Sequence, residues 1–548
     1  MSVKADFLTH EVLNQPQAMP AYNAWSSDQV LRECVEREGG GWAADHLEWH
    51  GGICGGPMME QGELANVHKP LLHTFDRYGR RIDEVEFHPA YHEVMRHSMA
   101  AQVHSFSWRN ADKKGAHVVR AALSYLSGQA EAGTGCPLTM THAAVPVLQR
   151  NPALAKEWIP KVLGTEYDPR SLPMAQKTAC TIGMGMTEKQ GGTDVRANTT
   201  RAIAQADGSY EIVGHKFFFS APMCDAHLVL AQTDVGLSCF LLPRVLADGS
   251  LNAVRIQRLK DKLGDWANAS SEVEFQGATA WMVGQEGRGV ATILEMVALT
   301  RLDCAVGSAA TMRQALVQAL SHTHQRSVFG KTLAQQPLMR NVLADLALES
   351  EAATTLAMRI ASAVDRAQHD EHEAALARLV TAVGKYWICK RTAVFVNEAQ
   401  ECLGGIGYVE ENIMPRLYRQ APLNSIWEGS GNVQCLDVLR ALRREPEVRD
   451  ALFAELYRVR GQNAALDRQT QWLDQALNDA AALEQGSRYV VERMALAMQA
   501  ALLLQNAPDF VANAFCHSRL DGMHGLAFGT LDSSAPFDAL IERAMPQI

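Results

Sequence analysis

One carboxylate stands in a setting suited to proton transfer. Glu428 follows Trp427 and precedes small and polar residues in the run 426–432, Ile-Trp-Glu-Gly-Ser-Gly-Asn. Partial burial raises the pKa of a carboxyl group towards neutrality, which suits it to act as a general base. A solvated glutamate at the start of a helix is the alternative interpretation. Glu428 is therefore a candidate base that needs support from other segments.

A glycine-rich run and an aromatic run could hold a flat cofactor. Residues 183–194 read Gly-Met-Gly-Met-Thr-Glu-Lys-Gln-Gly-Gly-Thr-Asp. Glycines let the backbone approach a ring or a phosphate, while free N–H groups and threonine hydroxyls donate hydrogen bonds. Residues 214–220, Gly-His-Lys-Phe-Phe-Phe-Ser, could wall one side of a planar ring. The alternatives are an ordinary turn and a core strand, and the first run is not a Rossmann G-x-G-x-x-G fingerprint.

Two further segments complete a set of five motifs. Residues 326–331 read Arg-Ser-Val-Phe-Gly-Lys, and residues 404–408 read Gly-Gly-Ile-Gly-Tyr. In this order and spacing, the five motifs resemble those of the acyl-CoA dehydrogenase family over about residues 90–440. Four details resemble its AidB-like members, bacterial flavoproteins of the adaptive response to DNA alkylation. These details are residues 14–16, the Glu-Lys-Gln variant of the glycine-rich run, residues 335–337 and residues 424–428.

The resemblance implies an FAD cofactor bound by three groups of residues. The first group matches positions at the flavin ring and its pyrophosphate: Met186, Thr187, Gly192, Thr193, Phe218 and Ser220. The second matches positions that serve the FAD of a neighbouring subunit: Arg326, Phe329, Gly404 and Gly405. Gln336 is assigned to the same group, although it is displaced from the usual family position of this Gln. The third matches ribose and phosphate contacts beside the base: Ser430 and Asn432. A site shared between subunits implies a homotetramer built as a dimer of dimers.

The resemblance places Glu428 at the catalytic base of the family. It implies removal of the α-proton of an acyl-CoA thioester and hydride transfer to flavin N5. We therefore expect an FAD-dependent oxidoreductase that acts in the response to DNA alkylation and retains α,β-dehydrogenation. An ordinary short- or branched-chain acyl-CoA dehydrogenase with a helical assembly extension is the alternative, and FAD as a purely structural group is a third. Glu401, where the family has Gln, has no assigned role.

Three arginines suggest a surface for a polyanion. Arg440, Arg443 and Arg444 have i, i+3 and i+4 spacing and so share one helix face. We expect this face to bind double-stranded DNA weakly and without sequence preference. Salt bridges to Glu447 or to the helical bundle are the alternative. The chain has 51 Lys+Arg against 61 Asp+Glu, so DNA binding must come from such a local patch.

These residues need a scaffold, and the pattern of the chain predicts an α+β fold of four parts. We expect a mainly helical domain over 1–180, an antiparallel β-barrel over 181–284, a helical bundle over 285–445 and a helical extension over 446–548. Short alternating runs predict strands at 210–213, 227–230, 239–242 and 271–275.

Apolar residues at helical spacing predict the helices. Helices are expected between Tyr91 and Gln129, and Val103 belongs to the first set of apolar residues at helical spacing there. The bundle helices are marked by two sets of apolar residues: Ile293, Leu294, Val297, Leu302 and Val306, then Leu338, Val342 and Leu346. Residues 77–80, Arg-Tyr-Gly-Arg, predict a tight turn.

Composition excludes several other classes of protein. Hydrophobic residues make up 47% and charged residues 20%, which is ordinary for a globular protein. The 11 cysteines form no C-x-x-C pair, and we expect reduced thiols in the cytoplasm. The longest apolar stretch, 494–504, predicts a buried helix and no membrane span, and residues 1–20 show no secretory signal. His369 and His372 lie in a charged surface stretch, so we expect no metal.

Overall fold

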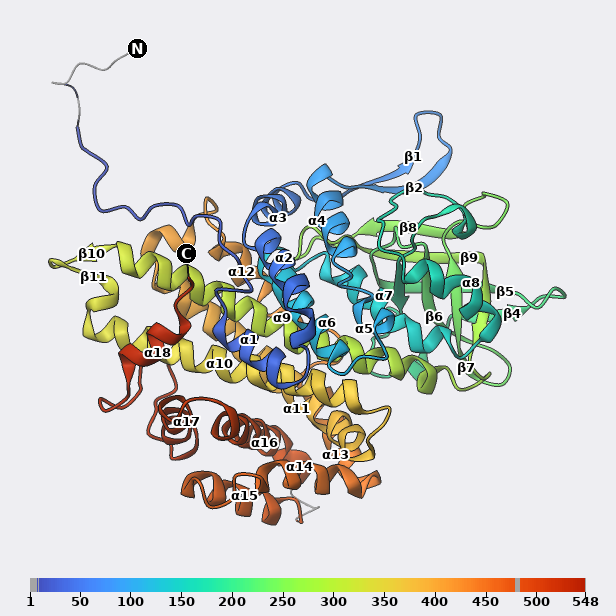
Figure 1. The fold of residues 1–548 in the computed structure, drawn as a ribbon. Helices are drawn as coiled ribbons and strands as arrows, with labels where there is room; N and C mark the ends of the chain where they lie inside the picture. Colours follow the sequence, from blue (N-terminus) through green and yellow to red (C-terminus); the bar gives the residue numbers. More distant parts are fainter. Residues whose placement is uncertain (1–6, 8, 479–482, 548) are drawn as a thin grey trace.

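The computed structural model describes residues 7, 9–478 and 483–547 (Figure 1). Helices dominate the first part of the chain. They are α1 Gln29–Arg37, α2 Ala44–Cys54, α3 Pro57–Val67, α4 Pro89–Ala100, α5 Phe106–Arg109, α6 Ala116–Ala130, α7 Gly135–Leu148 and α8 Pro152–Val162. Side-chain caps fix several helix starts: Asp28 accepts from the Leu31 N–H at 3.0 Å, and Asn151 caps α8.

Two details of this part differ from the sequence expectation. A β-hairpin, β1 Leu71–Phe75 and β2 Arg81–Glu86, projects from the helices (Figure 1), and the predicted turn at residues 77–80 connects its strands. The helices predicted between Tyr91 and Gln129 form as α4, α5 and α6, but the predicted helical position of Val103 is wrong. Gln102 has a φ of +64°, in the left-handed region, so the chain reverses between α4 and α5 and Val103 lies in a turn.

A small barrel follows the first helices and confirms the predicted strands. Its strands are β3 Ile182–Gly185, β4 Arg201–Ala204, β5 Tyr210–Ser220, β6 Ala226–Gln232, β7 Leu237–Pro243, β8 Val254–Leu259 and β9 Ser270–Val283. The pairings β6–β4, β4–β5, β5–β9, β9–β7 and β7–β6 close a ring. Most pairs are antiparallel, while β3 and the end of β4 lie parallel to β6.

Long helices form the second half of the chain. The bundle comprises α9 Gly289–Gln325, α10 Pro337–Arg366, α11 Glu371–Glu401, α12 Met414–Gln420 and α13 Gly431–Arg444. A short hairpin, β10 Ser327–Val328 and β11 Lys331–Thr332, joins α9 to α10. The extension comprises α14 Pro446–Tyr457, α15 Ala464–Ala476, α16 Leu483–Asn506, α17 Asp509–Phe515 and α18 Phe537–Ala544.

The core follows the predicted helix faces with two exceptions. Ile293, Val297, Leu302, Val306 and Leu346 are buried, and α16 is the buried helix expected over residues 494–504. Leu294 and Leu338 are instead 46% and 85% exposed, because these positions face outward in the first turns of α9 and α10. The α+β fold is confirmed, while the boundaries at residues 180, 284 and 445 stay a prediction.

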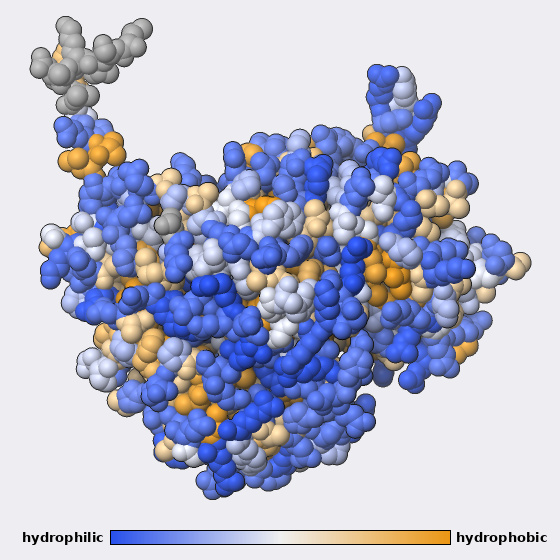
Figure 2. All heavy atoms as spheres, viewed as in Figure 1, coloured by the Kyte–Doolittle hydropathy of each residue, from blue (hydrophilic) through white to orange (hydrophobic). Residues whose placement is uncertain are grey.

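Cysteines and surface complete the description. All 11 cysteines are free and buried. The visible face is mainly hydrophilic, with apolar side chains in small groups (Figure 2). In the described parts of the chain, no helix combines the length and apolar character needed to cross a membrane.

Candidate active site

Glu428 lies in the loop before α13, and its side chain is held by α9. The hydroxyl of Thr300 donates to Oε2 of Glu428 at 2.7 Å. Burial raises the pKa of the Glu428 carboxyl above its ordinary value, and the Thr300 hydrogen bond together with the charges of Lys385 and Arg301 offsets only part of this rise. A carboxylate held in this way is a better proton acceptor than one in water.

The backbone around Glu428 has an unusual conformation that several long side chains support. Glu428 has a φ of +57°, which is rare for a residue with a Cβ. Arg301 donates to the Glu428 carbonyl at 3.1 Å and forms an ion pair with Asp437 at 2.7 Å. Lys385 of α11 donates to the Trp427 carbonyl at 2.7 Å and also to the Gly429 carbonyl. These contacts fix the direction in which the carboxylate points.

The predicted flavin residues of the barrel lie next to this loop. β3 leads into the glycine-rich run, and the N–H of Phe217 donates to the Thr187 carbonyl at 2.8 Å, which places β5 with Phe218 and Ser220 alongside. Trp427 and Met186 pack against the same buried cluster. The Glu428 loop and the glycine-rich run therefore border the same buried cluster.

A buried ion pair anchors the glycine-rich run. Lys216 of β5 contacts Glu188 at 2.9 Å, and neither side chain is exposed to solvent. Glu188 also accepts from the N–H groups of Thr199 at 2.7 Å and Thr200 at 3.2 Å. Burial alone would raise the pKa of Glu188, but Lys216 and these donors lower it to about 2. The carboxylate is therefore ionised and ties the middle of the run to β5 and to the segment that precedes β4.

The second predicted group lies at the opposite end of α9. Thr300 lies in the first third of α9, and Arg326 directly follows its last residue, Gln325. The 26 positions between Thr300 and Arg326 correspond to roughly 40 Å at 1.5 Å per residue. α10 begins and α11 ends at the Arg326 end, so Gln336, Gly404 and Gly405 lie there too (Figure 1). One chain therefore does not bring this group to its own Glu428.

The predicted residues at the Arg326 end of α9 lie on and around a tight hairpin. Phe329 and Gly330 have φ values of +49° and +77°, as the central residues of a two-residue hairpin turn do, and Phe329 is 99% exposed. Arg326 donates to the Asn14 carbonyl, and the Asn14 side chain exchanges two hydrogen bonds of 2.7 Å with the Ser327 backbone. The segment around Asn14 thus braces this hairpin.

The residues present fit the cofactor that the resemblance implies. A Cβ at Gly404 or Gly405 would meet nothing within 4 Å, so the backbone there faces open space. The Phe218 ring is 51% exposed at the barrel surface, and Gly192 and Thr193 are exposed in the loop beside it. Such flat apolar surface, open backbone and hydroxyl donors match a ring system with phosphates.

The remaining predicted residues lie on α13. Ser430 precedes the first residue of the helix, and Asn432 accepts from Arg488 at 3.2 Å. Arg440, Arg443 and Arg444 are exposed; Arg440 lies 3.9 Å from Asp437, and Arg443 lies 3.9 Å from Glu484. Glu401 is exposed at the end of α11 and accepts from Asn397 at 3.0 Å. Among the residues that the structure describes, no group of three or more His, Cys, Asp or Glu could hold a metal ion.

Comparison with known proteins gives three family matches along the chain. Residues 14–169 match the adaptive response protein AidB N-terminal domain. Residues 183–278 match the acyl-CoA dehydrogenase middle domain, and residues 287–443 match the acyl-CoA dehydrogenase C-terminal domain. These matches contain all five motifs found in the sequence.

Individual relatives agree with these matches. AidB of Escherichia coli strain K12 is 50% identical over 94% of this chain and 96% of its own length. Acyl-CoA dehydrogenase family member 11 of Caenorhabditis elegans is 30% identical over 82% of this chain and 75% of its own length. The crystal structure of C. elegans ACDH-11 in complex with C11-CoA has a TM-score of 0.85 at 26% identity, covering 95% of both chains.

The cofactor of this family is FAD, and the predicted resemblance is confirmed over most of the chain. The chain therefore belongs to the acyl-CoA dehydrogenase family, in its AidB-like branch, and is an FAD-dependent oxidoreductase of the acyl-CoA dehydrogenase type.

Proposed function

We propose that Glu428 removes the α-proton of an acyl-CoA thioester. Bound FAD supplies the hydride acceptor for the β-carbon. The observation that carries this proposal is the carboxylate itself, with a raised pKa and one oxygen fixed by Thr300 at 2.7 Å. The C11-CoA bound to the C. elegans relative supports an acyl-CoA thioester as the substrate class.

Neighbouring residues keep the base dry and oriented. Trp427 donates from Nε1 to Asn424 at 2.8 Å and packs with Met186 against the buried cluster, so its indole limits the access of water to Glu428. Arg301 and Lys385 bind backbone carbonyls on both sides of the base. Their charges lower the pKa of Glu428 and offset part of the rise that burial causes.

We propose that each flavin site uses two chains of a homotetramer, a dimer of dimers. Met186, Thr187, Phe218 and Ser220 would hold the ring in one chain. The distance of roughly 40 Å along α9 supports a role for Arg326 and its neighbours in the site of the partner chain. A guanidinium suits the pyrophosphate because its fork binds phosphate oxygens in pairs. Gly192, Thr193, Phe329, Gln336, Gly404, Gly405, Ser430 and Asn432 complete the proposed contacts.

We further propose that the protein acts in the response to DNA alkylation, in the cytoplasm. The 50% identity to E. coli AidB supports this role, and 11 free cysteines suit a reducing compartment. Arg440, Arg443 and Arg444 form the proposed contact with double-stranded DNA, because all three are exposed on one helix.

An anaerobic titration tests the enzymatic proposal. The purified flavoprotein is mixed with acyl-CoA thioesters of increasing chain length and branching, and flavin bleaching is followed. We expect bleaching by at least one thioester, and its loss in Glu428→Gln. Flavin that no thioester bleaches would contradict the proposal. Fast bleaching without any DNA binding would favour an ordinary short- or branched-chain dehydrogenase.

A further inference from the structure

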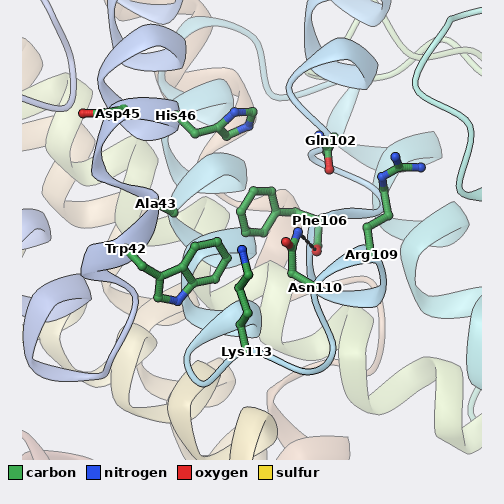
Figure 3. A pocket seen from close by; sticks show the side chains of 9 residues that line it. All are labelled: Trp42, Ala43, Asp45, His46, Gln102, Phe106, Arg109, Asn110 and Lys113. Atoms are coloured by element: carbon green, nitrogen blue, oxygen red, sulfur yellow. Dashed lines mark hydrogen bonds between the residues drawn. The ribbon is translucent and has the colours of Figure 1, made fainter.

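A pocket of about 410 Å³ opens among the N-terminal helices, away from the residues discussed so far (Figure 3). Its walls come from the short 3-10 helix η2 Gly41–Ala43, from α2, and from the segment 102–113 around α5. None of its lining residues belongs to the Glu428 loop or to the flavin-binding groups. The function proposed above therefore does not account for it.

Aromatic rings form the inner wall of the pocket. Phe106 is buried, and its ring stacks on Trp42 with centroids 5.5 Å apart and planes at 18°. His46 lies 5.3 Å from Phe106 on the other side. Trp42 remains 42% exposed, and its Nε1 donates to the Lys114 carbonyl at 2.9 Å, so a large apolar ring is fixed at the pocket mouth. The exposed Trp42 ring, supported from behind by Phe106, can accept a flat ring by stacking.

Two cations stand at the rim. Lys113 holds its ammonium 4.2 Å from the centroid of the Trp42 ring, and Arg109 lies on the opposite side in Figure 3. Both side chains are exposed. Asp45 contributes one carboxylate to the lining, which leaves the rim with a net positive charge. The rim therefore favours an anion close to the aromatic wall.

Hydrogen-bonding groups lie between the rings and the cations. Asn110 donates from its side chain to the Phe106 carbonyl at 2.9 Å, so its carbonyl oxygen remains the acceptor. His46 contacts the Ala101 carbonyl through Nε2 at 2.9 Å, and since a carbonyl only accepts, Nε2 carries the proton. In a neutral ring Nδ1 is then an acceptor. Acceptors beside an aromatic wall suit a ring that carries N–H groups on its edge.

We propose that this pocket binds a nucleoside phosphate. The base lies against the exposed ring of Trp42, its amino group faces the Asn110 and His46 acceptors, and the phosphate pairs with Lys113 and Arg109. A free nucleotide, the nucleotide part of coenzyme A and a nucleotide within a DNA strand share this chemistry. The inference does not rest on the chemistry proposed for Glu428.

Calorimetric titration of the flavin-loaded full chain at low salt tests the pocket. AMP is the probe, and bound FAD keeps it out of the flavin site. We expect AMP to bind, and adenosine and inorganic phosphate each to bind at least about tenfold more weakly. Adenosine lacks the phosphate that pairs with the cations, and inorganic phosphate lacks the base. Parallel titrations with coenzyme A and with a short oligodeoxyadenylate are repeated on Lys113→Glu, because both ligands also fit sites proposed above. The source is the ligand whose Kd this variant raises most.

Two variants connect binding to the pocket. Lys113→Glu replaces a charge-assisted contact by repulsion, so the Kd for AMP should rise at least about tenfold. Trp42→Ala removes the stacking surface and should weaken AMP by about tenfold. Lys156→Glu, an exposed lysine of α8 outside the pocket, is the matched control and should leave the Kd unchanged.

Three results would overturn the proposal. The first is a wild-type protein that binds none of the three nucleotide ligands. The second is a Kd that changes equally in Lys113→Glu and Lys156→Glu, since the ligand then lies elsewhere. The third combines two observations: the wild type does not bind AMP, and light scattering shows that Lys113→Glu has a different molecular mass from the wild type. This result would assign the pocket to contact with a second copy of the chain.

Discussion

The Thr300 hydroxyl and the Glu428 carboxylate lie 2.7 Å apart although 128 residues separate them in the chain. Thr300 belongs to the continuous helix α9, whereas Glu428 belongs to a loop with a left-handed backbone. The rigid helix α9 thus holds the carboxylate of a residue that belongs to an irregular loop. Contacts from α9, together with Lys385 of α11, therefore set the position of the base.

Replacing Glu428 by Gln should remove the chemistry and keep the cofactor. Gln has nearly the same shape but accepts no proton, so flavin reduction by the best thioester should slow by ~10²–10⁴-fold. Stopped-flow absorbance measures the rate, and the visible spectrum measures the flavin content. Glu157→Gln on the exposed side of α8 is the control. An unchanged rate in Glu428→Gln would remove this residue from the reaction.

Replacing Thr300 by Val should move the pH dependence of that rate. The Thr300 hydrogen bond lowers the pKa of Glu428, so its loss raises this pKa further above the ordinary value. The base works in its ionised form, and the acid limb of the rate–pH profile should therefore shift to higher pH, with little change above it. Thr311→Val, whose hydroxyl donates to Gly307 within α9, should leave the profile in place. A shift of the limb to lower pH would contradict this assignment.

Replacing Lys216 by Met should destabilise the barrel strongly. It leaves the Glu188 carboxylate buried without its cation, which typically costs ~3–5 kcal/mol. Urea denaturation should show this loss, and Glu188→Gln in the same chain should recover part of it. Arg96→Met breaks the exposed pair with Glu93 and should cost less than ~1 kcal/mol. Equal losses from the Lys216 and Arg96 variants would show that the buried pair does not anchor the run.

The same pair predicts a pH dependence of stability. The pKa of Glu188 falls from 4.5 to about 2 on folding, so the folded state favours the ionised form. Its contribution is fully present above pH 4.5 and is lost as the pH falls towards 2. The Glu188→Gln, Lys216→Met double variant should lack this component in denaturation curves measured across that range.

The quaternary proposal predicts a mass and a flavin content. Light scattering should give four times the 60.1 kDa of one chain. Arg326→Ala should lower the FAD bound per chain, because it removes a phosphate contact from the partner site. Arg288→Ala, exposed at the opposite end of α9, is the control. A monomer that carries a full complement of FAD would rule out the shared site.

The DNA proposal predicts a salt dependence. Fluorescence anisotropy of a random duplex at two salt concentrations gives the slope of log K against log salt, to which each neutralised phosphate contributes ~0.9. The triple variant Arg440→Ala, Arg443→Ala, Arg444→Ala should bind more weakly and with a smaller slope. Alanine at Arg458, Arg460 and Arg468, exposed elsewhere in the extension, is the control. Equal affinity in both triple variants would remove α13 from the DNA contact.

Local patterns predicted much of the fold. The sequences at 210–213 and 239–242 are short runs bounded by turn residues, which predicts strands, and both strands form in the barrel. The β1–β2 hairpin was missed because most residues of β1 are exposed or half-exposed, so no buried face marks the strand. The break after α4 was missed because its left-handed residue is Gln102 and not a glycine.

The candidate site was only partly accessible from sequence. Glu428 and the glycine-rich run lie in compact motifs, and each could be found within a dozen residues. Thr300 and Arg301 of α9 and Lys385 of α11 hold the Glu428 loop from distant helices, and no local spacing connects them to it. Lys216 lies within the aromatic motif, but its partner Glu188 is defined by the register of the barrel.

All 11 cysteines are buried, so the rate at which each one reacts with a thiol reagent reports local unfolding around it. A thiol reagent in water meets no accessible sulfur in the folded state, and burial raises the thiol pKa at sites such as Cys389 and Cys402, which suppresses the reactive thiolate. Labelling therefore requires part of the molecule to unfold transiently. Mass spectrometry of labelled peptides over time would then rank the barrel, the bundle and the extension by the free energy needed to open each one.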